Sequence, residues 1–212
     1  MRTFSFLPAF AVLLLQASTA QAQFFELGVR AGTNIATPSA DSAVSSHTGI
    51  VLGAMAAFTI IEPLRLQVEA QYVQKGGTFT VSTPAGTDIN DLSLNYLEIP
   101  ISLTLPLDFY PVQVYGLFGT TIGTLISASN QYEYADGRTG TEDVADDFDP
   151  ENLSLELGAG VSYAISEHIA AVAETRYSFG VVDLGNDQRD LFNQDSWKTR
   201  NIKILAGITF AI

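Results

Sequence analysis

The chain has 212 residues, no cysteine and a formal net charge of −13, from 10 Lys or Arg against 23 Asp or Glu. Without cysteine there is no disulfide framework and no thiol chemistry, and an acidic surface repels the phosphates of nucleic acids. The hydrophobic content is 47%, which is unusual for a strongly acidic soluble protein.

The first 22 residues predict a cleaved signal peptide. Arg2 supplies a positive start, residues 6–15 form an apolar run, and Ala20-Gln21-Ala22 is a small-x-small cleavage site. This run is shorter than the roughly 20 apolar residues of a transmembrane helix. No later run is long enough either, so the exported chain is expected to cross a membrane as a closed β-barrel, which leaves no strand edge in lipid. We predict a signal peptide over 1–22 and one barrel domain over 23–212.

The first half of the mature chain alternates between apolar and polar residues with a period of two. This pattern, in segments of about ten residues, is typical of strands in a membrane barrel. Leu27, Leu52, Val68 and Ile101 are examples from the apolar face. The predicted strands here are 24–34, 49–60, 64–75 and 94–105.

The second half continues the pattern with four more segments. In 112–126 the alternation is weak, so the sequence leaves the facing of its side chains open. The last three segments alternate clearly, with Leu157, Tyr177 and Ile204 on the apolar face. They are 153–165, 168–180 and 199–212. Together the eight segments predict an all-β, eight-stranded antiparallel transmembrane barrel of up-and-down topology.

The connections between the predicted strands alternate in length, as in outer-membrane barrels with short periplasmic turns and long extracellular loops. The short connections are 61–63, 106–111 and 166–167. The long ones are 35–48, 76–93, 127–152 and 181–198. Both chain ends are therefore expected on the periplasmic side of the outer membrane, and the long loops outside.

Aromatic residues are expected in two bands, as in the girdles at the two membrane interfaces. The predicted periplasmic band is Phe24, Phe25, Phe58, Tyr163 and Phe210, and the opposite band is Tyr72, Tyr177, Phe179 and Trp197.

Charged residues share the polar phase of their strands. An eight-stranded barrel is just wide enough for side chains to fill it, so these charges are expected to pair inside the lumen and plug it. A polar, gated conduit is the alternative. The predicted lumen charge network consists of Glu26, Arg30, Arg65, Glu69, Glu98, Glu156, Glu174, Arg176 and Lys203.

Four strand segments carry a more specific resemblance. They read GVRAGTNIA at 28–36, LQVEAQYVQKGG at 66–77, LNYLEIPISL at 94–103 and GTTIGTLISAS at 119–129. They resemble the PorT-like outer-membrane β-barrel family of Bacteroidetes-type bacteria over the whole mature chain. The resemblance implies an outer-membrane barrel and no single activity, although the name-giving member is associated with secretion and maturation of exported proteases. The chain departs from the usual barrel ending, because Phe210 is followed by Ala211 and Ile212.

The two histidines offer little catalytic chemistry. His47 and His168 are expected at opposite rims, so they cannot share a metal ion or a proton relay. Ser45 and Ser46 adjoin His47, yet adjacency in sequence is not the geometry of a catalytic triad. No G-x-S-x-G motif occurs, and Gly158-Ala159-Gly160 lies inside a predicted strand, where small residues relieve crowding.

The predicted loop 127–151 is the most acidic segment. Oxygen-rich clusters of this kind suit hard divalent cations, but the spacing does not match an EF-hand loop. A solvated loop and weak cation bridging to lipopolysaccharide are the two interpretations. The candidate cation ligands are Asp143, Asp146, Asp147, Asp149 and Glu151.

We therefore predict a non-enzymatic outer-membrane barrel with a structural, secretion or surface-interaction role carried by its extracellular loops. The alternatives are a small-solute pore and a surface lipid-modifying enzyme. Outer-membrane lipid and lipopolysaccharide are the expected partners, together with other envelope proteins, and the protein is expected to be a monomer. No cofactor, catalytic residue or nucleic-acid partner is predicted.

Overall fold

A computed structural model describes residues 25–39, 44–83, 86–145, 151–181 and 198–212. The predicted signal peptide, Phe24, Trp197 and most of the predicted connection 181–198 lie outside these residues. No helix in the described ranges is long and apolar enough to cross a membrane. The strands are β1 Phe25–Ser39, β2 Val44–Ile61, β3 Leu64–Thr83, β4 Gly86–Phe109, β5 Val112–Glu133, β6 Thr139–Asp143, β7 Glu151–Ala164, β8 Ile169–Gly180 and β9 Lys198–Ala211.

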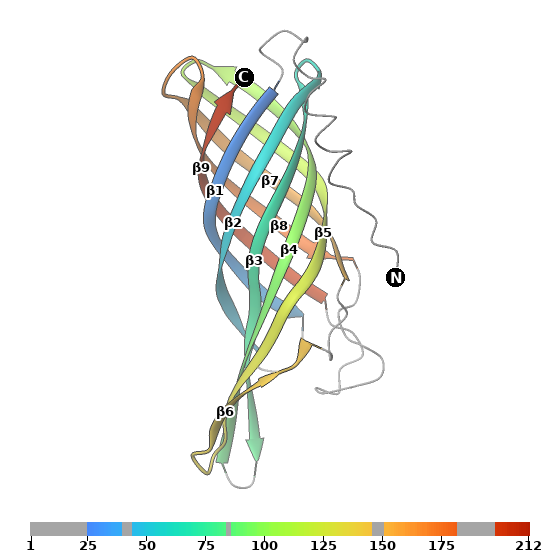
Figure 1. Ribbon diagram of the computed structural model, residues 1–212, viewed down its shortest axis with the longest axis vertical. Coiled ribbons are helices and arrows are strands. Elements are labelled where there is room, and N and C mark those ends of the chain that lie inside the picture. Colours follow the sequence, from blue (N-terminus) through green and yellow to red (C-terminus); the bar gives the residue numbers. More distant parts are fainter. Residues whose placement is uncertain (1–24, 40–43, 84–85, 146–150, 182–197) are drawn as a thin grey trace, which may run out of the picture.

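Eight of these strands form a closed antiparallel ring (Figure 1). Each pairs with its neighbours in the order β1-β2-β3-β4-β5-β7-β8-β9, and β9 pairs with β1 to close the ring. The short strand β6 pairs with β5 beyond the end of the β5–β7 ladder, so β6 and β7 follow one another along the same edge of β5. The predicted eight-stranded antiparallel barrel is confirmed.

The two faces of the wall follow from the period-two pattern. On β4, Leu97, Ile99, Ile101 and Leu103 are 39 to 46% exposed on the outer surface, while the alternate residues are buried inside. The apolar outer residues of β4 continue to Leu107. Ten residues of tilted strand span about 25 Å, the height of the apolar band in outer-membrane barrels.

Short turns close one end of the barrel. Glu62-Pro63 joins β2 to β3, Tyr110-Pro111 joins β4 to β5, and residues 165–168 join β7 to β8. The turn predicted at 106–111 is therefore shorter, because β4 continues to Phe109. The exposed rings of Phe58, Tyr163 and Phe210 lie toward this short-turn end.

The prediction of long loops at 76–93 and 127–152 was wrong, because much of both segments is strand. The β3–β4 ladder runs on to the pair Thr83 and Gly86, and the β4–β5 ladder runs on to Ile89 and Glu133. These extensions and β6 form a narrow lobe at the end opposite the short turns (Figure 1). We define the lobe as the described residues of 77–95 and 127–145.

In the outer part of the lobe, residues on both faces are exposed or half-buried, which explains why the sequence pattern did not predict it. Thr78, Thr80 and Ile89 favour extended backbone, but neither face needs to be uniformly apolar, so the alternation disappears. Loop 35–48 is shortened in the same way, since β1 continues to Ser39 and β2 begins at Val44.

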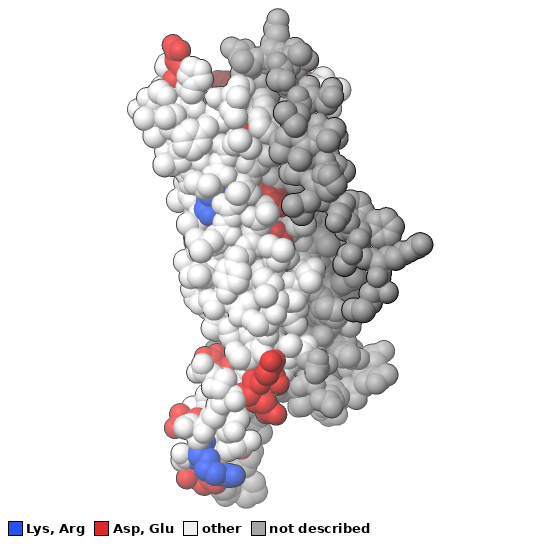
Figure 2. All heavy atoms as spheres, viewed as in Figure 1, with Lys and Arg blue, Asp and Glu red and all other residues white. Residues whose placement is uncertain are grey.

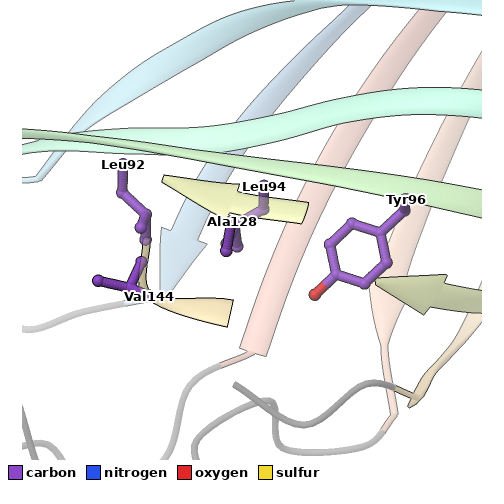
Figure 3. Packing of buried hydrophobic residues seen from close by; sticks show 5 residues of the cluster. All are labelled: Leu92, Leu94, Tyr96, Ala128 and Val144. Atoms are coloured by element: carbon purple, nitrogen blue, oxygen red, sulfur yellow. The ribbon is translucent and has the colours of Figure 1, made fainter. Parts of the chain in front are cut away.

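A small apolar cluster lies where the lobe meets the barrel (Figure 3). Leu92, Leu94 and Tyr96 point inward from β4 and pack with Ala128 and Val144. The inner face of β4 thus changes from polar near the short turns, through Glu98, to apolar at the lobe. The polar face that the sequence indicates from Glu98 to Thr104 therefore does not continue to the lobe end of β4.

Candidate functional site

The predicted lumen charges lie inside the barrel, in two groups. Glu26 and Arg65 are half-buried at the short-turn end, where an Arg65 nitrogen lies 3.3 Å from a Glu26 oxygen. The other seven are buried in the middle of the lumen, each with no more than 6% of its surface exposed. They are Arg30, Glu69, Glu98, Glu156, Glu174, Arg176 and Lys203.

Two ion pairs cross the full width of the lumen. Arg176 of β8 donates to Glu69 of β3, and these strands lie opposite each other in the ring. The Lys203 Nζ of β9 donates to Glu98 Oε2 of β4 at 2.7 Å, and these two strands are also opposite. In each pair, the two side chains therefore meet across the barrel axis.

Shorter bridges join the crossing pairs into one network. Arg176 also binds Glu174 and lies 3.3 Å from Glu156, while Lys203 lies 2.8 Å from Glu156. Arg30 donates to Glu174 at 2.8 Å. Buried charges are expensive unless they are paired and hydrogen-bonded, and here each carboxylate contacts at least one cation.

Neutral side chains complete the hydrogen bonding. The Gln67 and Gln71 amides each donate to Glu69 at 2.7 Å, and the Tyr115 hydroxyl donates to Glu174 at 2.7 Å. Since both oxygens of Glu69 are bound, its charge is held in a fixed place.

Glycines on the inner face make room for the long side chains. A Cβ at Gly207 would lie 2.9 Å from Arg30 Cγ, and a Cβ at Gly160 would lie 2.3 Å from the Tyr115 ring. The prediction that small residues relieve crowding in this part of β7 agrees with the position of Gly160.

The open space narrows sharply from the short-turn end. A cavity of about 320 Å³ opens there beside Glu26, Arg65 and His168. Further in, beside Arg30 and Tyr115, the cavity is about 30 Å³, which is room for about two water molecules.

Lys75 and Tyr115 belong to the network, and neither was predicted from the sequence. Lys75 is 1% exposed, its Nζ lies 2.6 Å from Glu98 Oε1, and it sits 4.8 Å from the centre of the Tyr96 ring. It shares the odd-numbered phase of Glu69, so its facing was readable from the sequence. Tyr115 was hidden by the weak alternation of its strand.

With Lys75 included, the carboxylates and cations that the described residues place inside the barrel are equal in number. The carboxylates are Glu26, Glu69, Glu98, Glu156 and Glu174, and the cations are Arg30, Arg65, Lys75, Arg176 and Lys203.

The histidines and the acidic loop do not form a second centre in the described part of the chain. His47 Nδ1 lies 3.7 Å from Asp91 near the lobe, whereas His168 lies in the β7–β8 turn at the other end. Of the candidate cation ligands, Asp146, Asp147, Asp149 and the side chain of Glu151 lie outside the described residues. Asp143 is exposed on β6, and no described group of three or more His, Cys, Asp or Glu is arranged to hold a metal ion.

Solved structures share the fold. Neisserial surface protein A aligns with a TM-score of 0.54 and 18% identity, covering 89% of this chain and 97% of that one. A major outer membrane protein from Thermus thermophilus aligns at 0.54 and 13%, covering 89% and 99%. OprG from Pseudomonas aeruginosa aligns at 0.51 and 12%, covering 90% and 97%. Identities this low show the fold alone.

No curated protein matches the chain. The family described as outer membrane protein beta-barrel domain, however, matches residues 7–210. That match covers nearly the whole chain, and it agrees with the closed ring, the apolar outer band and the polar lumen. The chain belongs to the outer membrane protein beta-barrel domain family and is an outer-membrane protein.

Proposed function

We propose that this protein is a non-enzymatic outer-membrane barrel whose lumen is closed by its own side chains and which acts through the surface outside the membrane. The observation that carries the proposal is the pair of ion bridges between opposite strands, Arg176 to Glu69 and Lys203 to Glu98. Side chains joined across the axis leave no continuous water path at their level.

Charge balance and free volume support the same proposal. Carboxylates and cations inside the barrel match in number, so the lumen has little net charge to attract ions. The cavity beside Arg30 and Tyr115 has a volume of about 30 Å³, far below that of a path for hydrated solutes. The apolar cluster around Leu94 and Val144 adds a second barrier at the lobe.

The proposed orientation puts the short turns in the periplasm and the lobe outside the cell. It is supported by loop asymmetry, since outer-membrane barrels have short periplasmic turns and longer outer loops. Charged side chains gather on the lobe, whereas the visible barrel wall is almost free of them (Figure 2). Lipopolysaccharide and other envelope proteins are the proposed partners of this surface. A secretion-associated role, like that of the name-giving member of the PorT-like family, is compatible with this proposal.

The test is conductance of the purified, refolded protein in planar bilayers. The wild-type barrel is expected to show no discrete conductance steps. A variant with Glu69→Ala, Glu98→Ala, Arg176→Ala and Lys203→Ala removes both members of each crossing pair and leaves the net charge unchanged, and steps are expected to appear.

Heat modifiability on gels shows whether each sample is folded before conductance is compared. A matched control removes Asp136 and Arg138, an exposed ion pair at the tip of the lobe, and should stay silent. Discrete steps from the folded wild-type protein would favour the small-solute pore instead.

The proposal assigns no catalysis to the contact between His47 and Asp91. Such a pair could belong to a surface lipid-modifying enzyme, but at 3.7 Å it is a loose contact and the charged lumen has no role in such chemistry. An unchanged lipid profile in a deletion strain agrees with the non-enzymatic proposal.

A further inference from the structure

Strand β6 leaves one edge unpaired among the described residues. Of the described strands, it is the one with a single hydrogen-bonded neighbour, β5, along Thr139–Asp143. Alternate residues of an antiparallel edge strand turn their backbone N–H and C=O groups away from the sheet. Such an edge is a ready template for another extended chain. It lies in the lobe, beyond the apolar band.

The surroundings of this edge are acidic. Asp143 and Glu142 lie on β6 itself, on opposite faces of the sheet, and Glu133 pairs with Thr139 from β5. Arg138 is the one basic residue in the described part of the lobe, and Asp136 engages it at 2.7 Å. Figure 2 shows acidic atoms gathered over this part of the molecule. A strand added to β6 would therefore sit beside uncompensated carboxylates.

An aromatic ring reaches over the middle of the edge. Gly140 pairs with Tyr132, and a Cβ at Gly140 would lie 2.3 Å from the Tyr132 hydroxyl. The ring therefore leans across β6 in the space that a side chain would occupy. Tyr134 lies beside it, with ring centres 4.9 Å apart. Arg138 already lies 5.0 Å from the centre of the Tyr134 ring, so this tyrosine pair accepts a cation over a ring face.

We propose that the β6 edge binds an extended, Lys- or Arg-rich segment of a partner protein as an added strand. The inference rests on the proposed function, since it names the partner chemistry of the outer surface. Backbone hydrogen bonds would supply the affinity, while Glu142, Asp143 and Tyr132 would select cationic side chains.

The same charges disfavour a second copy of this chain. Pairing two β6 edges would bring Glu142 and Asp143 of each copy close to acidic residues of the other, and like charges on adjacent strands repel. Acidic edges of this kind block self-association, yet they complement a basic strand. The occupant that fits is therefore a cationic chain.

The binding test uses two synthetic peptides with the refolded full-length protein in detergent. The first is Lys-Val-Lys-Val-Lys-Val-Lys, and the second replaces each valine by proline, which keeps the charge but removes backbone donors and the extended pairing geometry. The first peptide is expected to bind at least tenfold more tightly, and to slow hydrogen exchange at the amides of residues 139–143. Equal binding of the two peptides, or no binding of either, would overturn the proposal.

Charge variants test whether Glu142 and Asp143 select a cationic peptide. Glu142→Gln with Asp143→Asn is expected to weaken binding of the first peptide about tenfold. The matched control, Asp108→Asn with Glu167→Gln, removes the same charge at the short-turn end and should bind as the wild-type protein does. Equal weakening in both variants would show a general charge effect and contradict the β6 assignment. The peptide-binding assay depends neither on whether the lumen is closed nor on the orientation of the barrel. Conductance steps from the wild-type protein would therefore overturn the closed-lumen proposal and leave the β6 proposal unaffected.

Discussion

Arg176 is the residue on which most of the lumen network converges. It is 1% exposed and contacts Glu69, Glu156 and Glu174. Removing one member of a buried ion network leaves the partners charged and without compensation, which costs more than the pair itself contributes. Arg138, in contrast, pairs with Asp136 in water, and exposed pairs contribute little.

Arg176→Met is expected to lower the free energy of unfolding by about 3 to 5 kcal/mol, whereas Arg138→Met should change it by less than about 1 kcal/mol. Urea unfolding of the protein refolded in lipid vesicles measures both. Adding Glu69→Gln to Arg176→Met should recover part of the loss, because it removes one of the three carboxylates that lose a cation and leaves Arg30 to Glu174. Equal, small losses in the two single variants would contradict a buried network.

Strand β7 shows how an element is adapted to the network. Gly160 faces inward against the Tyr115 ring, which it allows to approach the wall and donate to Glu174. A Cβ added at Gly116 of β5 would meet open space, since no atom lies within 4 Å of that position. A side chain is therefore excluded at Gly160 and has room at Gly116, although the two glycines lie in neighbouring strands.

Gly160→Ala is expected to destabilise the barrel by about 1 to 3 kcal/mol, as an overpacked core does, because the new methyl group displaces Tyr115. Gly116→Ala serves as the control and should be close to neutral. Urea unfolding of the two variants, refolded in lipid vesicles, compares their free energies of unfolding. A neutral Gly160→Ala would mean that Tyr115 is not packed against the wall.

The strands differ in how far they could be predicted from the sequence. Strands that separate lipid from a polar lumen carry the alternation, and all eight were predicted within a few residues at the short-turn end. The outer part of the lobe lacks it, because residues on both of its faces are exposed or half-buried. The apolar inner face of β4 at Leu92 and Leu94 was also not predicted. The residues that cover it, Ala128 and Val144, come from a distant part of the chain.

The whole molecule depends on closure of the ring by its first and last strands. Gly32 of β1 approaches β9 closely, and a Cβ there would lie 1.9 Å from the Ile204 carbonyl oxygen. Thr33, the next residue, faces outward and is exposed. Closure removes every barrel edge from the lipid, where an unpaired backbone group would be expensive.

The folded barrel in an unboiled sample is expected to migrate differently on a detergent gel from the boiled, unfolded protein. Gly32→Val should reduce or abolish the heat-modifiable form, because the valine side chain obstructs the β1–β9 seam, while Thr33→Val should keep it. Densitometry of unboiled samples after refolding measures the folded fraction. A full heat shift in Gly32→Val would show that the seam tolerates a side chain there.

In seven of the eight predicted strands, sequence alone determined which residues face lipid and which face the lumen, because a strand places alternate side chains on opposite faces and the barrel gives those faces opposite polarity. It also predicted nine charged residues of the lumen. The inward facing of Lys75 could have been predicted in the same way, because Lys75 shares the phase of Glu69. Only the tertiary structure decided which charge meets which. Arg176 and Glu69 are 107 positions apart, and Lys203 and Glu98 are 105 apart. Such partners are brought together by ring closure and by the stagger between strands, and a local pattern contains neither.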